Sequence, residues 1–121
     1  MTVVLLRHAS AGDRAEWTGD DRLRSLDKKG RKQADALVDP LRALGVRRVL
    51  SSPYVRCTQT VAPLAHALGV EIEIDDRLAE GAGGAARALL ESLRDAVACT
   101  HGDIVEEVLG RTLKKGAFAQ V

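Results

Sequence analysis

Short runs of apolar residues alternate along this chain with longer segments whose apolar residues recur at helical spacing. Residues 2–6 read TVVLL, a β-branched run of the length typical of a strand. The same reasoning predicts strands at 47–52 (RRVLSS), 70–74 (VEIEI), 96–100 (AVACT) and 116–121 (GAFAQV). The pattern therefore predicts five short strands.

Amphipathic helices are predicted between these strands. From about Lys28 to Leu44 the apolar residues share one helical face, and Gly45 follows as a stop signal. A second helix is predicted up to Leu68, with Pro53 in its first turn. Shorter helices are expected at 85–94 and 103–109. Strands that alternate with helices predict a mostly parallel sheet covered on both faces, a three-layer α/β/α sandwich.

The composition limits the class of protein. The 121 residues suit a single domain, 1–121, and the three aromatic residues predict an aliphatic core. The 18 basic and 17 acidic residues lack the broad positive charge of a nucleic-acid-binding protein. No apolar run approaches the length of a membrane span, and the amino terminus does not have the pattern of a leader peptide. Cys57 and Cys99 are expected to be reduced. These features predict a cytoplasmic protein.

Three polar clusters follow predicted strands. Arg7-His8 follows the first strand, Ser51-Ser52 and then Arg56 follow the second, and Thr100-His101 follows the fourth. Because the carboxyl ends of parallel strands meet at one edge, one crevice is expected to hold all three clusters. Two guanidinium groups suit a phosphoryl dianion, and a neutral imidazole can attack its phosphorus. The nearby arginines are expected to lower the pKa of His8.

Simpler interpretations exist for each residue taken alone. Arg7-His8 can be a polar strand end, and His101 can be a turn histidine. Ser10, Ser51, Ser52 and Thr100 are interpreted either as phosphate donors or as caps of helices and turns, with capping favoured for most of them. His66 is interpreted as a surface residue, and Arg14, Lys28 and Arg31 as solvated charges or entrance residues. Neither cysteine begins a Cys-x5-Arg motif, no phosphate-binding P-loop motif occurs, and His8, His101 and Asp103 are too few to favour a metal site.

Four motifs together carry a family resemblance. LLRHASAG, SSPYVRCTQT, LAEG and CTHGD, in this order, resemble the histidine phosphatase superfamily, also called phosphoglycerate-mutase-like. Within it the chain is most similar to the small SixA-like phosphohistidine phosphatase branch. A similar domain follows Nudix hydrolase domains in some two-domain proteins. The similarity extends from Val3 to Phe118, although Ala9 replaces the glycine of the commoner R-H-G form.

The resemblance implies a role for each site residue. His8 is implied to be the nucleophile, Arg7 and Arg56 the phosphate clamps, and His101 a histidine that stabilises the transition state. Glu80 lies where larger family members have a proton donor, so it is either a general acid or a loop carboxylate.

The expected activity is that of a metal-independent phosphohydrolase without a cofactor, acting on a phosphohistidine protein. The alternatives are a phosphatase of small phosphomonoesters or nucleotides, a mutase, or a phosphate-binding module with little turnover. The expected partners include neither nucleic acid nor a membrane, and association with a Nudix-type domain is possible in principle. Since nearly all residues are assigned to strands, helices and short connections, the crevice is expected to be shallow and without a lid.

Overall fold

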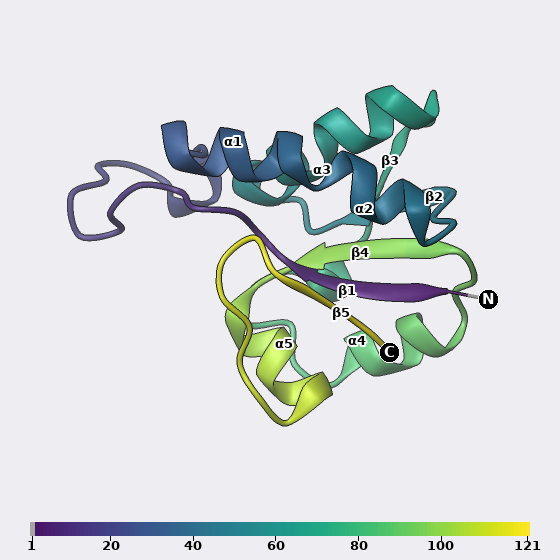
Figure 1. The fold of residues 1–121 in the computed structure, drawn as a ribbon. Helices are drawn as coiled ribbons and strands as arrows, with labels where there is room; N and C mark the ends of the chain where they lie inside the picture. The colour runs from purple at the N-terminus through teal and green to yellow at the C-terminus, as the bar shows by residue number, and fades with distance from the viewer. Residues whose placement is uncertain (1) are drawn as a thin grey trace.

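The computed structural model describes residues 2–121, in which five strands form one sheet (Figure 1). The strands are β1 (Val3–Arg7), β2 (Arg48–Ser51), β3 (Ile72–Ile74), β4 (Ala96–Thr100) and β5 (Phe118–Gln120). Their order across the sheet is β3-β2-β4-β1-β5. The first four pair in parallel, and β5 pairs antiparallel with β1 at one edge. The predicted, mostly parallel sheet is confirmed.

Helices cover both faces of the sheet (Figure 1). One face carries α1 (Lys28–Ala36), α2 (Val38–Ala43) and α3 (Val55–Leu68), and the other carries α4 (Ala85–Glu91) and α5 (Gly102–Leu109). Two single-turn 3-10 helices, η1 (Asp21–Leu23) and η2 (Asp76–Leu78), were not expected from the sequence. The predicted three-layer sandwich is confirmed.

Two clusters of buried aliphatic side chains fill the layers on either side of the sheet. Val4 and Leu6 of β1 belong to the cluster under α3, whereas Leu5 between them belongs to the cluster under α4 and α5. This alternation follows from the two-residue period of a strand. All five residues of β4 are buried, as expected for the central strand of the sheet.

The helix predicted from Lys28 to Leu44 is in fact two helices. The chain leaves regular helix at Leu37, between α1 and α2, and Pro40 lies three residues further on. Proline lacks the amide hydrogen of a helix, and its ring clashes with the carbonyl group four residues earlier, which here belongs to Ala36, the last residue of α1. The hydrophobic spacing continues across this break, which is why it predicted a single helix.

Two further helix boundaries differ from the expectation. Tyr54 is the N-cap of α3, so Pro53 precedes this helix instead of lying in its first turn. α4 ends at Glu91, three residues earlier than expected, and Asp95 follows with φ 50° in the left-handed region. No helix among residues 2–121 is both long and apolar enough to cross a membrane.

The polar segment between β1 and α1, which the sequence left without a helix or strand, contains a long connection followed by η1. Residues 8–20 contain neither a helix nor a strand, and they extend away from the sheet (Figure 1). Asp27 ties this connection to α1, because its carboxylate accepts hydrogen bonds from Ser10 Oγ (2.7 Å), Gly12 N (3.1 Å) and Gly30 N (2.8 Å). The connection forms one wall of the cavity described below, so the expectation of a crevice bounded only by short connections is wrong.

Candidate active site

The three predicted polar clusters meet at the carboxyl edge of the sheet. Arg7 ends β1 and is paired with Thr100, the last residue of β4, so His8 and His101 follow neighbouring strands. The centroids of the two imidazole rings are 5.4 Å apart. Arg56 approaches the same place from the first turn of α3. The sequence-based expectation of one shared crevice therefore agrees with the positions of these residues.

A cavity of about 880 Å³ opens at this edge. Its lining comprises Arg7, His8, Gly12, Asp13, Arg14, Arg24, Asp27, Glu80, Gly102, Asp103, Glu106, Thr112 and Lys115. Arg56 and His101 are almost completely buried and lie behind this lining. The lining thus places the cationic Arg7 with His8 and is otherwise of mixed charge.

The contacts of His8 fix the orientation of its imidazole ring. Nδ1 lies 2.8 Å from the carbonyl oxygen of Ala9, an oxygen that can only accept, so Nδ1 carries the hydrogen. The neutral ring therefore keeps its lone pair on Nε2. The amide of Ala9 in turn donates to Thr60 Oγ1 at 2.9 Å, which ties this turn to α3.

His8 is held in its neutral, nucleophilic form. Burial, the largest cause, lowers the pKa of His8 from 6.5 to about 3; the hydrogen bond to Ala9 opposes this shift, and the charges of His101, Arg56 and Arg7 add to it. The direction agrees with the sequence-based expectation. The main cause differs, since removal of the ring from water outweighs the arginine charges.

His101 is held through Nε2, whereas His8 is held through Nδ1. Nε2 lies 2.9 Å from Ser52 Oγ and 3.5 Å from Cys57 Sγ. The ring of Tyr54 packs edge-on against it, with centroids 4.6 Å apart. Nδ1 is buried without a partner. Ser52 was interpreted as a cap; its oxygen does accept from the amide of Tyr54 at 3.2 Å, but it also contacts His101.

Arg7 is anchored by the segment that precedes β5. Its Nη1 donates to the carbonyl oxygen of Leu113 at 2.8 Å, whereas its Nε is buried without a partner. Gly102 lies directly against the guanidinium group, and a Cβ atom there would be 3.1 Å from Arg7 Cζ and Nη2. The glycine thus leaves room for Arg7 at the start of α5.

Arg56 is completely buried, and η1 holds its terminal nitrogens. Nη1 donates to the carbonyl oxygen of Asp21 at 2.8 Å, and Nη2 donates to Asp21 Oδ2 at 3.1 Å. The guanidinium carbon lies 4.9 Å from the ring centroid of Tyr54. Nε again has no partner. An anion at this site would meet Nε, the nitrogen of the guanidinium group that has no partner.

The unpartnered buried nitrogens identify the kind of ligand that fits this site. Among residues 2–121, the buried side-chain nitrogens and oxygens without a hydrogen-bond partner are Arg7 Nε, Arg56 Nε and His101 Nδ1. A buried donor without an acceptor costs about 1–3 kcal/mol. All three belong to residues predicted to clamp phosphate. A group with several acceptor oxygens, such as a phosphoryl group, fits them.

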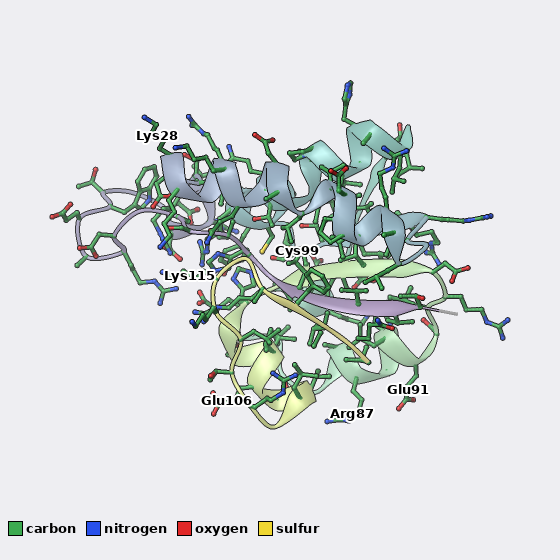
Figure 2. All side chains as sticks on the ribbon, viewed as in Figure 1. Lys28, Arg87, Glu91, Cys99, Glu106 and Lys115 are labelled. Carbon is green, nitrogen blue, oxygen red and sulfur yellow. The ribbon has the colours of Figure 1, made fainter. Side chains whose placement is uncertain are left out.

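Glu80 lies in the same cavity as a charge partner of two arginines. Its Oε1 is 2.8 Å from Arg14 Nη2, and its Oε2 is 3.5 Å from Arg56 Nη2. Arg14 thus lines the entrance, one of the two alternatives for this residue. Lys28 and Arg31 are exposed and do not line the cavity, and Lys28 lies at the outer side of α1 (Figure 2).

The sequence analysis missed the acidic anchor of the site. Asp21 binds Arg56, and its Oδ1 also accepts from Arg24 Nε at 2.9 Å; Arg24 in turn donates to the carbonyl oxygen of Ala11. Desolvation raises the pKa of Asp21, but Arg24, Arg56 and Arg14 together lower it. The sequence DDRLR reveals charged residues only, since the contact with Arg56 joins positions 35 residues apart.

The described residues present no obvious metal site. No group of three or more His, Cys, Asp and Glu side chains within residues 2–121 is arranged to hold a metal ion. Cys57 and Cys99 are both free and buried, as expected, and Cys99 lies between the sheet and the α1–α3 layer (Figure 2). His66 is exposed on α3, also as expected.

Comparison with known proteins identifies the class. The family model of the histidine phosphatase superfamily (branch 1) matches residues 3–98, and the chain belongs to this superfamily. The family resemblance inferred from the motifs is thereby confirmed.

Two curated relatives carry more particular names. An alignment of 112 positions that covers 86% of this chain shows 41% identity to an 8-oxo-(d)GTP phosphatase of Mycolicibacterium smegmatis. An alignment of 85 positions that covers 66% of the chain shows 31% identity to a probable phosphoglycerate mutase GpmB of an Enterobacter species. The matched regions span 35% and 38% of those two proteins, so the chain corresponds to little more than a third of either relative.

Solved structures of low sequence identity share the fold. A putative phosphohistidine phosphatase SixA from Agrobacterium tumefaciens superposes with a TM-score of 0.78 at 22% identity, covering 98% of this chain and 89% of that one. The protein histidine phosphatase SixA complexed with tungstate gives 0.78 at 24% identity, covering 100% and 87%. These matches confirm the predicted phosphoglycerate-mutase-like fold.

Proposed function

We propose that this chain is a metal-independent phosphohydrolase that transfers a phosphoryl group from its substrate to Nε2 of His8. The observation that carries the proposal is the set of three buried nitrogens without partners, Arg7 Nε, Arg56 Nε and His101 Nδ1, beside the imidazole of His8. A phosphoryl group supplies acceptor oxygens for the two arginine nitrogens and, with Ser52 Oγ donating to His101 Nε2, for the hydrogen on His101 Nδ1, while His8 Nε2 approaches the phosphorus. Membership of the histidine phosphatase superfamily supports the same chemistry.

The reaction has two steps that leave the enzyme unchanged. The lone pair of His8 Nε2 forms a bond to phosphorus, and the bond from phosphorus to the leaving group breaks with its electron pair. Water then attacks the phosphohistidine, so that orthophosphate leaves and neutral His8 returns. Arg7, Arg56 and His101 stabilise the charge on the equatorial oxygens during both steps.

The position of Glu80 bears on the leaving group. A general acid must carry a proton, whereas Glu80 faces the guanidinium groups of Arg14 and Arg56 as an ion-pair partner. This arrangement favours substrates whose leaving group departs without a dedicated acid. The phosphoanhydride of a nucleotide and the labile N–P bond of a phosphohistidine both meet this requirement better than an alkyl phosphate.

Nucleotides are the first substrate class we propose. The relative named an 8-oxo-(d)GTP phosphatase is 41% identical over most of this chain, which supports a shared substrate class more strongly than similarity of fold alone. The second candidate is a phosphohistidine protein, which the SixA-like motifs predict. Association with a Nudix-type domain stays a proposal, and copurification of the two is its test.

Trapping the intermediate tests the activity. With a nucleotide labelled in its terminal phosphate, rapid quenching should give label on the protein that is stable in alkali and lost in acid. His8→Ala should abolish the label and reduce turnover by several powers of ten, while His66→Ala, an exposed histidine, is the matched control. Full turnover in EDTA is expected. Retention of more than about a tenth of the rate by His8→Ala would exclude His8 as the nucleophile, because it corresponds to less than about 1.4 kcal/mol of barrier.

A further inference from the structure

A second cavity adjoins the catalytic one along the connection that follows His8. Its volume is about 290 Å³, and its lining comprises Gly12, Asp13, Glu16, Trp17, Arg24, Ser25, Leu26 and Asp27. Four of these residues, Gly12, Asp13, Arg24 and Asp27, also line the catalytic cavity. A ligand held at His8 by its phosphoryl group can therefore extend towards the second cavity along this shared wall.

Trp17 is the distinctive residue of the second cavity. It is the single tryptophan of the chain, and 40% of its surface is exposed. Its indole nitrogen donates to the carbonyl oxygen of Asp20 at 3.0 Å, and its backbone amide donates to the carbonyl oxygen of Asp13 at 3.1 Å. The ring is thus held in place by the loop itself. Because its only donor is already used, the ring offers a ligand its flat π surface.

The other lining residues complement this surface. Leu26 adds an apolar side chain, whereas Asp13 and Glu16 add carboxylates and Ser25 a hydroxyl group. A flat aromatic ring next to hydrogen-bond acceptors suits a nucleobase, which has a π face for stacking and N–H donors along its edge. A phosphohistidine also has a flat ring, but that ring is bonded directly to phosphorus, so it would lie beside His8 and would not reach the second cavity.

We propose that the cavity beside Trp17 binds the base of a nucleotide whose phosphoryl group is transferred to His8, with the base stacked on the indole ring. The proposal rests on the proposed function of His8, and it assigns the nucleotide class to the same site. Asp13 and Glu16 favour bases whose edge carries N–H donors, such as guanine, because carboxylates can only accept.

Direct binding tests the base site independently of turnover. Since Trp17 is the only tryptophan, the fluorescence of the His8→Ala protein, excited at a wavelength that tyrosine does not absorb, reports this position alone. A guanine nucleotide should change the emission at concentrations where ribose 5-phosphate and inorganic phosphate leave it unchanged. Equal responses to the nucleotide and to ribose 5-phosphate would overturn the base site, whatever the catalytic result.

Steady-state kinetics provides a second test of the base site. Trp17→Ala should lower the ratio of kcat/KM for the guanine nucleotide to kcat/KM for acetyl phosphate, which has no base, by about tenfold or more, mainly through KM. Trp17→Phe should restore most of this ratio because it keeps a stacking face. Leu23→Ala, at an exposed apolar residue of η1, is the control.

The outcomes separate the two proposals. An unchanged ratio in Trp17→Ala contradicts the base site but not the phosphohistidine intermediate. If neither the guanine nucleotide nor acetyl phosphate forms a phosphoenzyme, the result contradicts the proposed function and therefore the base site as well.

Discussion

At the scale of single residues, each residue that we propose to bind phosphate is fixed by protein contacts through part of its side chain and keeps one nitrogen without a partner. Leu113 holds Arg7, Ser52 contacts His101, and Asp21 holds Arg56. Such anchoring orders the donors before a substrate arrives, which reduces the entropy lost when a phosphoryl group binds. These anchors are therefore as much a part of the site as the donors themselves.

Asp21 provides a test of this anchoring. Asp21→Ala removes the carboxylate that joins Arg56 to Arg24, and hydrogen bonds to charged groups contribute about 1.5–3 kcal/mol. We expect kcat/KM for an aryl phosphate to fall about 10- to 100-fold, with a smaller loss in Asp21→Asn, which keeps an acceptor. The control is Asp20→Asn, since Asp20 is bound to Arg22 and not to Arg56. Equal rates in Asp21→Ala and wild type would show that Arg56 needs no anchor.

A smaller effect than that of Asp21→Ala is expected from a substitution of Glu80, which is a charge partner of arginines. Glu80→Gln should leave hydrolysis of a nucleotide or of a phosphohistidine protein within about threefold, since neither leaving group depends on a strong proton donor. An equally small effect is expected on alkyl phosphate hydrolysis, whereas a selective loss of about 100-fold or more on that substrate would show that Glu80 is a general acid. Rates measured on all three substrates give the answer. An equal loss on all three would identify Glu80 as a structural anchor of Arg14 and Arg56.

At the scale of elements, the contact between α1 and the connection after His8 depends on one glycine. A Cβ atom on Gly30 would overlap the carbonyl oxygen of Ser10, two residues after His8, the proposed nucleophile. Alanine normally stabilises a helix interior relative to glycine by about 1 kcal/mol. Here the overlap with Ser10 should make alanine less favourable than glycine for stability.

We therefore expect Gly30→Ala to lower the free energy of unfolding by about 1–3 kcal/mol and to reduce turnover. Urea unfolding measures the first and steady-state kinetics the second. Lys29→Ala, at the exposed neighbouring position of α1, is the matched control. A Gly30→Ala protein as stable as Lys29→Ala would mean that the connection is free to move away from α1.

The sequence predicted the elements well where hydrophobic spacing alone determines them. All five strands and the edge at which Arg7, His8 and His101 meet followed from apolar runs and polar residues at strand ends. The break at Leu37 was missed because the apolar face continues through it. The single turn η1 and the cavity wall formed by the connection after β1 were missed because polar residues give no periodic signal. The role of Asp21 depends on a contact between distant segments, which spacing along the chain does not encode.

At the scale of the whole molecule, burial of neutral His8 couples stability to pH. The unfolded chain protonates this imidazole below its ordinary pKa of 6.5, whereas the folded chain does so only near a pKa of about 3. Between these values the unfolded state binds more protons, so stability falls as pH decreases. The contribution of His8 to this loss is about 2 kcal/mol between pH 7 and pH 5.

Urea unfolding at pH 5, 6 and 7 checks this coupling. The loss of stability from pH 7 to pH 5 should be about 2 kcal/mol smaller in His8→Ala than in wild type. His66→Ala, a substitution of an exposed histidine outside the site, is the control. The same slope in all three proteins would show that His8 is protonated equally readily in the folded and unfolded chains.

The contacts around β1 also determine when the site can form during protein synthesis. β1, which carries His8, is synthesised before Leu113, which anchors Arg7 and lies 106 residues later in the chain. Gly116 and Ala117 complete the backbone bonds to Arg7 and His8. Until these residues leave the exit tunnel, the nascent chain contains His8, the proposed nucleophile, without the contacts that hold Arg7 beside it. Such contacts between distant parts of a chain also slow its folding.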